Sequence, residues 1–192
     1  MFSAAPRLIT QMGVLGAKLH SSRSRVRKTI EALALFMLGY LGWITYWALN
    51  GPDKLAEQVP THFDSSGRPN AWGSPAILWM LPVVAASLYL LFTALAGLQP
   101  GAFRLPVRMT EMNLPFIQKK TSEMAAMIKT EMMCLFSYIQ SGNIRGARIG
   151  EFRLSPTVVP VFMLVIFATL GIYAAVIIRG ARERAESART VV

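Results

Sequence analysis

Residues 158–178 read VVPVFMLVIFATLGIYAAVII and contain no charged side chain. Two more uncharged runs lie earlier in the chain, ALALFMLGYLGWITYWAL at 32–49 and PAILWMLPVVAASLYLLFTALAGL at 75–98. A helix of roughly 20 apolar residues crosses the hydrocarbon core of a bilayer. A small soluble core does not need uncharged runs of this length. The pattern therefore predicts an all-α integral membrane protein with three to four transmembrane helices in a small bundle.

The composition agrees with a membrane location. Of 192 residues, 53% are hydrophobic and 16% are charged, and the net charge is +10. A soluble domain usually carries about 25% charged residues. The basic residues flank the apolar runs, which is typical of contact with lipid headgroups and not of a nucleic-acid interface. The lipid bilayer is the predicted partner, and no nucleic acid is expected.

Catalytic and cofactor signatures are not visible in the sequence. Cys134 is the only cysteine, so neither an intrachain disulfide nor a cysteine metal cluster is expected. The chain shows no phosphate-binding loop, no dinucleotide glycine pattern, no nucleophile elbow and no metal-binding helix motif. We therefore predict a protein that is not an enzyme and that holds no cofactor or metal.

Charge and tryptophan placement predict the orientation. Residues 1–28 carry six basic side chains and no acid, and 179–192 form a second basic tail. Both tails are expected in the cytoplasm, on either side of a membrane domain at 29–178. All four tryptophans (Trp43, Trp47, Trp72 and Trp79) lie at or near the loop 50–74 and mark one membrane interface. This loop is expected to face outward from a membrane crossed several times, with the amino terminus inside.

The segment 121–140 has two interpretations. Met124, Ile128 and Leu135 belong to an apolar arc, whereas Glu123, Lys129 and Glu131 belong to the opposite, polar arc. The helix could lie in the cytoplasmic interface as an amphipathic helix. It could equally be a fourth span whose polar face turns toward the other helices. We favour four spans, because that layout places the basic residues after 178 in the cytoplasm.

The loop PTHFDSSGRPNAWGSP at 60–75 is polar and full of turn residues. His62 and Asp64 would point to the same side of an extended strand, and DSSG at 64–67 predicts a turn with Gly67 at positive φ. Ser74 and Pro75 suit the first positions of the next helix. Phe63 and Trp72 are expected at the membrane surface of a compact hairpin. His62 and Asp64 are too few ligands for a zinc site, and no activated nucleophile accompanies them.

This loop carries a family resemblance. VPTHFDSSGRPNAWGSP, placed between two spans, resembles the bacterial family called domain of unknown function 1648 over about 32–98. The matching positions are Pro60, His62, Phe63, Asp64, Gly67, Trp72, Gly73 and Ser74. Asn70 stands where the family often has Asp, and Pro75 where a Lys is common. LPVRMTEMN at 105–113 and FSYIQ at 136–140 also resemble the family's later portion.

The resemblance implies a role without catalysis. In the family, this domain forms the amino-terminal part of immunity proteins that protect a cell from a secreted peptide toxin and signal its presence. We expect an immunity-like or signal-transducing membrane protein whose outer loop recognises a peptide or small extracytoplasmic ligand. The candidate ligand-binding residues are His62, Phe63, Asp64, Gly67, Asn70 and Trp72. The alternative is a small transporter or membrane enzyme that uses the polar face of 121–140, with Glu123, Lys129 and Glu131. The sequence leaves the oligomeric state open.

Overall fold

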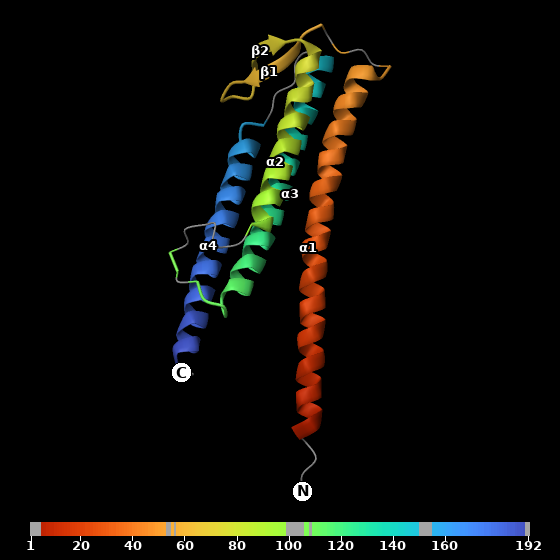
Figure 1. Cartoon of the computed structure of the whole chain (residues 1–192). Coiled ribbons are helices and arrows are strands. Elements are labelled where there is room, and N and C mark those ends of the chain that lie inside the picture. The colour runs from red at the N-terminus through yellow and green to blue at the C-terminus, as the bar shows by residue number, and fades with distance from the viewer. Residues whose placement is uncertain are drawn as a thin grey trace.

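The computed structural model describes residues 5–52, 55, 57–98, 106–107, 109–149 and 155–190, with side chains from residue 26 to residue 187. The elements in chain order are α1 (Ala5–Asn50), β1 (Val59–Phe63), β2 (Pro69–Gly73), the 3-10 helix η1 (Pro75–Trp79), α2 (Met80–Gly97), α3 (Leu114–Ile149) and α4 (Val158–Thr190). Successive long helices run in opposite directions (Figure 1). The strands and the start of α4 lie at one end of the bundle, the hairpin end. The end of α4 and the start of α1 lie at the other, the tail end.

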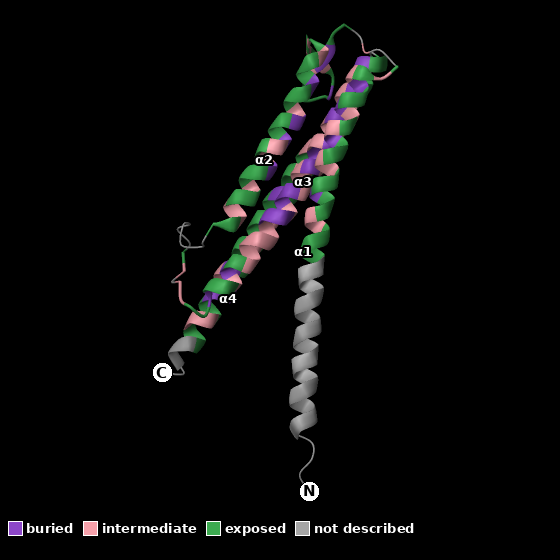
Figure 2. Ribbon diagram, turned by 45° about the vertical axis from the view of Figure 1, so that its right-hand side comes forward, coloured by how far each residue is buried: buried purple, intermediate pink, exposed green. Residues whose placement is uncertain are grey.

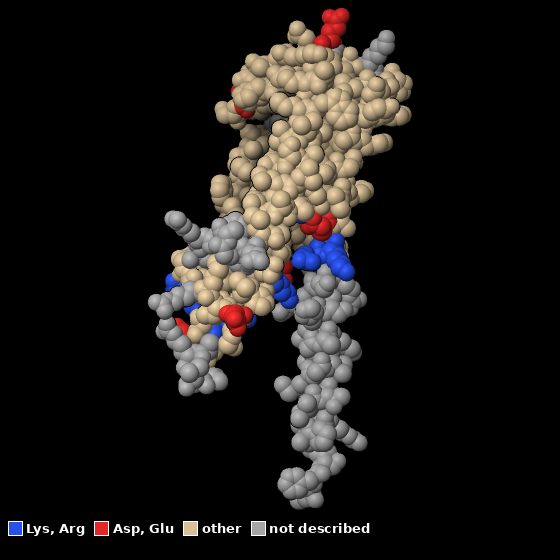
Figure 3. All heavy atoms as spheres, viewed as in Figure 1, with Lys and Arg blue, Asp and Glu red and all other residues tan. Residues whose placement is uncertain are grey.

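Within the described part of the chain, three helical segments are long and apolar enough to cross a membrane, at Val26–Asn50, Pro75–Gly97 and Val158–Ser187. Their outer surfaces carry large apolar side chains. Phe36 is 65% exposed, Leu90 is 67% exposed and Leu164 is 69% exposed. Such surfaces are stable in lipid and not in water. Lys and Arg side chains visible on one face gather toward the tail end, whereas acidic side chains are visible at both ends (Figure 3). The predicted all-α integral membrane bundle is confirmed.

The fourth long helix, α3, is the centre of the bundle. It packs against α1, α2 and α4. No residue between 119 and 144 is exposed, and the buried positions of the molecule concentrate on this helix (Figure 2). Both arcs of the amphipathic pattern are therefore covered, the polar one included. The helix also extends beyond the expected 121–140 at both ends. Its neighbours compensate for a sequence too polar to be recognised as a span by itself.

The helix ends follow the local sequence. α1 ends at Asn50, where the Gly51 amide bonds the Trp47 carbonyl at 2.8 Å and Pro52 follows. Ser74 caps η1, since its Oγ accepts from the Ala76 amide at 3.4 Å with Pro75 next in the chain. The cap at Ser74 was predicted from the sequence. The start of α1 was not, because helix extends back to Ala5 through the basic segment expected as a tail.

The tail end is closed by contacts between α3 and α4. Ile117, Ile177 and Ala181 form a buried cluster there. Asn113, fully buried just before α3, accepts from the Thr110 amide at 2.9 Å and donates to the Ala181 carbonyl at 3.2 Å. One side chain therefore organises the start of α3 and holds it against α4.

Candidate functional site

The loop at the hairpin end is an antiparallel hairpin, as predicted. β1 pairs with β2 in the register Val59↔Gly73, Pro60↔Trp72, His62↔Ala71 and Phe63↔Pro69, with irregularities on both sides of His62. The turn closes through the Asp64 amide to the Arg68 carbonyl at 2.8 Å and the Gly67 amide to the Asp64 carbonyl at 2.9 Å. Gly67 has a φ of 76°, a conformation that favours glycine.

Asp64 organises this turn. Its Oδ1 accepts from the Ser66 hydroxyl at 2.7 Å, the Ser66 amide at 2.8 Å and the Arg68 amide at 2.9 Å. These bonds, the Ser66 hydroxyl first, favour the carboxylate and lower the pKa of Asp64 below its usual value. The carboxylate therefore has a structural role in the turn of the hairpin, whether or not a ligand binds.

His62 lies exposed on β1 and bonds across the hairpin. Its Nδ1 lies 2.6 Å from Oδ1 of Asn70, so the contact recorded for His62 is with Asn70 and not with Asp64. With this oxygen as the acceptor, Nδ1 carries the proton, and Nε2 of the neutral ring remains free to accept a hydrogen bond. Trp72 is 46% exposed on β2. The hairpin thus presents an imidazole, an amide and an indole at the surface.

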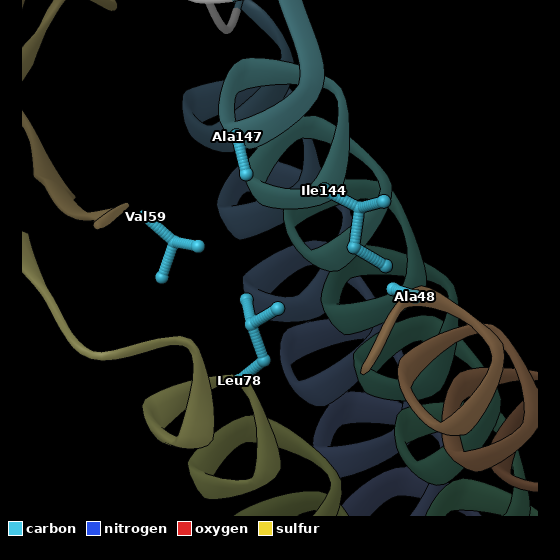
Figure 4. Packing of buried hydrophobic residues seen from close by; sticks show 5 residues of the cluster. All are labelled: Ala48, Val59, Leu78, Ile144 and Ala147. Atoms are coloured by element: carbon cyan, nitrogen blue, oxygen red, sulfur yellow. The ribbon is translucent and has the colours of Figure 1, made fainter. Parts of the chain in front are cut away.

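The base of the hairpin is fixed to the helices. Val59 is fully buried in one cluster with Ala48 of α1, Leu78 of η1, and Ile144 and Ala147 of α3 (Figure 4). Val59 pairs with Gly73, where an added Cβ would meet the Thr61 Cγ2 at 2.9 Å. The hairpin is therefore a packed part of the bundle, with its polar residues outside and an apolar foot inside.

A second polar site lies between α1, α2 and α3. Lys129 is only 3% exposed, and its ammonium group pairs with the Glu31 carboxylate and bonds Thr93 Oγ1 at 3.0 Å. It also lies 4.5 Å from the centre of the Tyr89 ring, whose hydroxyl donates to Glu31 Oε1 at 2.7 Å. Ammonium, carboxylate, phenol and hydroxyl thus satisfy one another. A cavity of about 290 Å³ beside them is lined by Arg27, Lys28 and Ser122, among others.

The sequence interpretation missed three of these four residues. Glu31 lies one residue before the apolar run that begins at 32, and so was counted with neither the span nor its polar face. One feature of the sequence could have drawn attention to Glu31, since it is the only acidic residue in the first 52. Tyr89 and Thr93 are spaced one turn apart on α2 and were hidden in a run counted only for its lack of charge.

The other two members of the expected polar face lie elsewhere. Glu123 pairs with Lys120 at 2.6 Å, near the tail end. Glu131 accepts from Thr169 Oγ1 at 2.6 Å, on the side of α3 that faces α4. The structure therefore does not bring Glu123, Lys129 and Glu131 together into one site.

Nearer the hairpin end, Gln140 is fully buried and joins three elements. Its Nε2 donates to Thr45 Oγ1 at 2.7 Å and to the Leu78 carbonyl at 2.8 Å. Among the described residues, no three His, Cys, Asp or Glu side chains lie close enough together to hold a metal ion.

Comparison with known proteins identifies the segment that carries the hairpin. The family model of the domain of unknown function DUF1648 matches residues 33–86, from within α1 through β1, β2 and η1 into α2. No curated protein and no solved structure shows significant similarity to the chain. The hairpin residues lie within the match, whereas α3 and α4 lie beyond it. Residues 33–86 of this integral membrane protein are thus similar to the DUF1648 domain.

Proposed function

We propose that this chain is a non-enzymatic membrane protein of the immunity or signal-transduction type, which recognises a peptide with its hairpin. One observation carries the proposal. The foot of the hairpin, Val59, is buried in the same cluster as residues of α1, η1 and α3, while His62, Asn70 and Trp72 are exposed on its two strands. A ligand that contacts the strands could therefore shift the packing where α1, η1 and α3 meet.

The geometry favours an extended peptide over a small ligand. β1 packs against α3 and pairs with β2, so β2 is the free edge of the sheet among the described residues. An extended peptide can add to such an edge through main-chain hydrogen bonds, and neighbouring side chains then give specificity. The Trp72 indole and the free His62 Nε2 would supply an apolar contact and a hydrogen-bond acceptor.

This role requires the hairpin to face outward. The expectation rests on the basic tails and on the tryptophans, all four of which are exposed, by 41–60%, toward the hairpin end. In a Cys134→Ser background, a thiol reagent applied from outside the cell should modify Ser65→Cys and spare Ser22→Cys. Labelling of Ser22→Cys alone would invert the orientation and remove the basis for external recognition.

Recognition itself can be tested without a known ligand. A displayed library of random peptides is selected on the full chain in nanodiscs, and synthetic copies of the enriched peptides are titrated while tryptophan fluorescence is followed. We expect the double variant His62→Ala/Asn70→Ala to weaken binding by about tenfold or more, equivalent to about 1.4 kcal/mol. Leu91→Ala, on the apolar surface of α2, is the control and should bind normally. Peptides that bind both variants equally would contradict a site at the hairpin.

The alternative, a transporter that uses the polar face of α3, is favoured by a separate observation. Glu131 is a carboxyl group within the bundle that has no recorded basic partner among the described residues. Unpaired ionisable groups inside membrane bundles often mark ion or proton pathways. The alternative therefore concerns Glu131, and not Lys129, whose charge is balanced by Glu31.

A further inference from the structure

A polar groove follows α3 on the side away from the Lys129–Glu31 pair. α1 and α4 both pack on α3, and within the described residues neither packs extensively on the other. A cavity of about 230 Å³ lies between α1, α3 and α4 at the tail end, and one of about 240 Å³ lies between α1 and α3 toward the hairpin end. The first is lined by Val26, Arg27, Ile30, Lys120, Glu123 and Tyr173. The second is lined by Tyr40, Ser137, Tyr138, Ser141, Gly142 and Arg145.

Polar side chains recur along this face of α3 because of helical spacing, and Met127 is an apolar residue on the same face. At 100° per residue, Glu123, Glu131, Cys134, Ser137 and Ser141 fall within roughly one third of the circumference of α3. The gap on the other side of α4 has a different, apolar lining. The gap between α2 and α4 is a cavity of about 430 Å³ lined almost wholly by apolar side chains, such as Phe92, Ile128 and Leu170. Lipid chains suit that gap, whereas water suits the α1–α4 groove.

Glu131 lies on α3 between the residues that line the two cavities, and its carboxylate is incompletely satisfied. Thr169 bonds Oε1, whereas Oε2 is buried without a hydrogen-bond partner among the described residues. The two ion pairs recorded in the described chain are Lys120–Glu123 and Lys129–Glu31, so neither neutralises Glu131. A carboxylate in apolar surroundings is costly unless it gains a cation or a proton. The unpartnered oxygen is where either would bind.

Hydroxyl side chains of α4 lie beside Glu131 and nearer the tail end. Tyr173 lies one turn beyond Thr169 on α4, toward the tail end, and lines the tail-end cavity with Glu123. The other charged or titratable groups near these side chains are Lys120 and Cys134 of α3 and Arg27 of α1. α2 lies on the far side of α3 and contributes none of its described residues.

We propose that Glu131 is a proton-binding site that exchanges with water at the tail end through the α1–α4 groove. The carboxylate takes up one proton at Oε2 and returns it along the same route, so no other bond changes. Thr169 and Tyr173 are positioning residues for this exchange. This inference names the ligand for the transport alternative and rests on it, and it is independent of peptide recognition at the hairpin.

Reaction with dicyclohexylcarbodiimide tests the proton site, because this apolar reagent adds to protonated carboxyl groups within membranes. The full chain in nanodiscs is treated over a range of pH and the modified residue is located by mass spectrometry. We expect labelling of Glu131 that falls about tenfold per pH unit once the group is mostly ionised. Glu131→Gln should lose this label, and the matched variant Glu183→Gln, exposed on α4, should keep it. Labelling of Glu131 that is absent at every pH, or constant with pH, would overturn the proposal.

Access through the groove needs a second measurement. In the Cys134→Ser background, Thr169→Cys and Leu170→Cys place thiols on neighbouring residues of α4 that face the polar groove and the apolar gap, respectively. A charged, membrane-impermeant thiol reagent should modify the first at least tenfold faster, although Leu170 is itself 37% exposed. Equal rates, or faster reaction at Leu170→Cys, would exclude a hydrated groove. Neither readout measures flux, so the two proposals can fail separately. A proton site found without transport would contradict only the transport alternative. Transport that persists in Glu131→Gln would not restore a proton site that had failed these two tests.

Discussion

The hairpin and the Lys129 site are two polar regions in an apolar chain, and they satisfy their polar groups in opposite ways. In the hairpin, Asp64 finds its partners two and four residues away, and His62 finds Asn70 eight residues away. In the bundle, Lys129 finds Thr93 at a separation of 36 residues and Glu31 at 98. The hairpin is specified by local sequence, whereas the ion pair exists only when three helices have assembled. The two regions should therefore respond differently to substitution.

The largest effect is expected at the ion pair. Lys129→Met leaves the Glu31 carboxylate between helices without its cation. Removal of one partner from a buried pair usually costs more than the pair contributes. Since Glu31 keeps 32% of its side-chain exposure, we expect a loss of about 2 kcal/mol, below the range for fully buried pairs. Thermal unfolding of the purified protein in detergent measures it.

The double variant Glu31→Gln/Lys129→Met is the control for that result. It removes both charges, so it should unfold closer to the wild-type temperature than Lys129→Met alone. If the stability losses of Glu31→Gln and Lys129→Met simply add in the double variant, Glu31 and Lys129 do not stabilise each other. The contrast between the two regions then fails.

A smaller effect of the same kind is expected at Gln140. Gln140→Leu keeps the volume but leaves the Leu78 carbonyl buried without its donor, which should cost about 1–2 kcal/mol. Thr45→Val/Gln140→Leu should lose no more stability than Gln140→Leu. The Thr45→Val change removes the hydroxyl oxygen that Gln140→Leu leaves without its donor. A strictly additive loss in the same unfolding assay would argue against a shared network.

The difference in range explains what the sequence could predict. The hairpin, its turn at Gly67 and the cap at Ser74 all depend on neighbouring residues, and each was predicted. The apolar spans were predicted because bilayer thickness sets their length. The pairing of Lys129 with Glu31 was not, because a helical wheel places a residue on a face without naming what lies opposite. The same limit grouped Glu123, Lys129 and Glu131, which the bundle separates.

Within the hairpin, the steric limit at Gly73 should give an effect of about 1 kcal/mol. Gly73→Ala places a Cβ about 2.9 Å from Thr61 Cγ2, so the strands must separate slightly. Thr61→Ser removes that methyl group, and Gly73→Ala should then be tolerated. The yield of folded protein by gel filtration compares Gly73→Ala in the two backgrounds. An equal loss in both would show that the contact with Thr61 is not the cause, and that the glycine is needed for its backbone.

The smallest and most local effect is expected at Asp64, and it depends on pH. Because hydrogen bonds lower the pKa of Asp64 in the folded chain, its carboxylate stabilises the turn above the ordinary value of 3.8, and this contribution is lost as the pH falls through the lowered folded value. Amide exchange at Ser66 and Arg68 should therefore quicken on acidification, relative to Asp64→Asn at the same pH. Asp64→Asn keeps an acceptor and should show no such change, whereas Asp64→Ala should exchange quickly throughout. If acidification loosens Asp64→Asn equally, another group controls the turn. If acidification of the wild-type chain also breaks the Lys129 site, the turn and the ion pair are coupled. Local specification is then not what distinguishes the two regions.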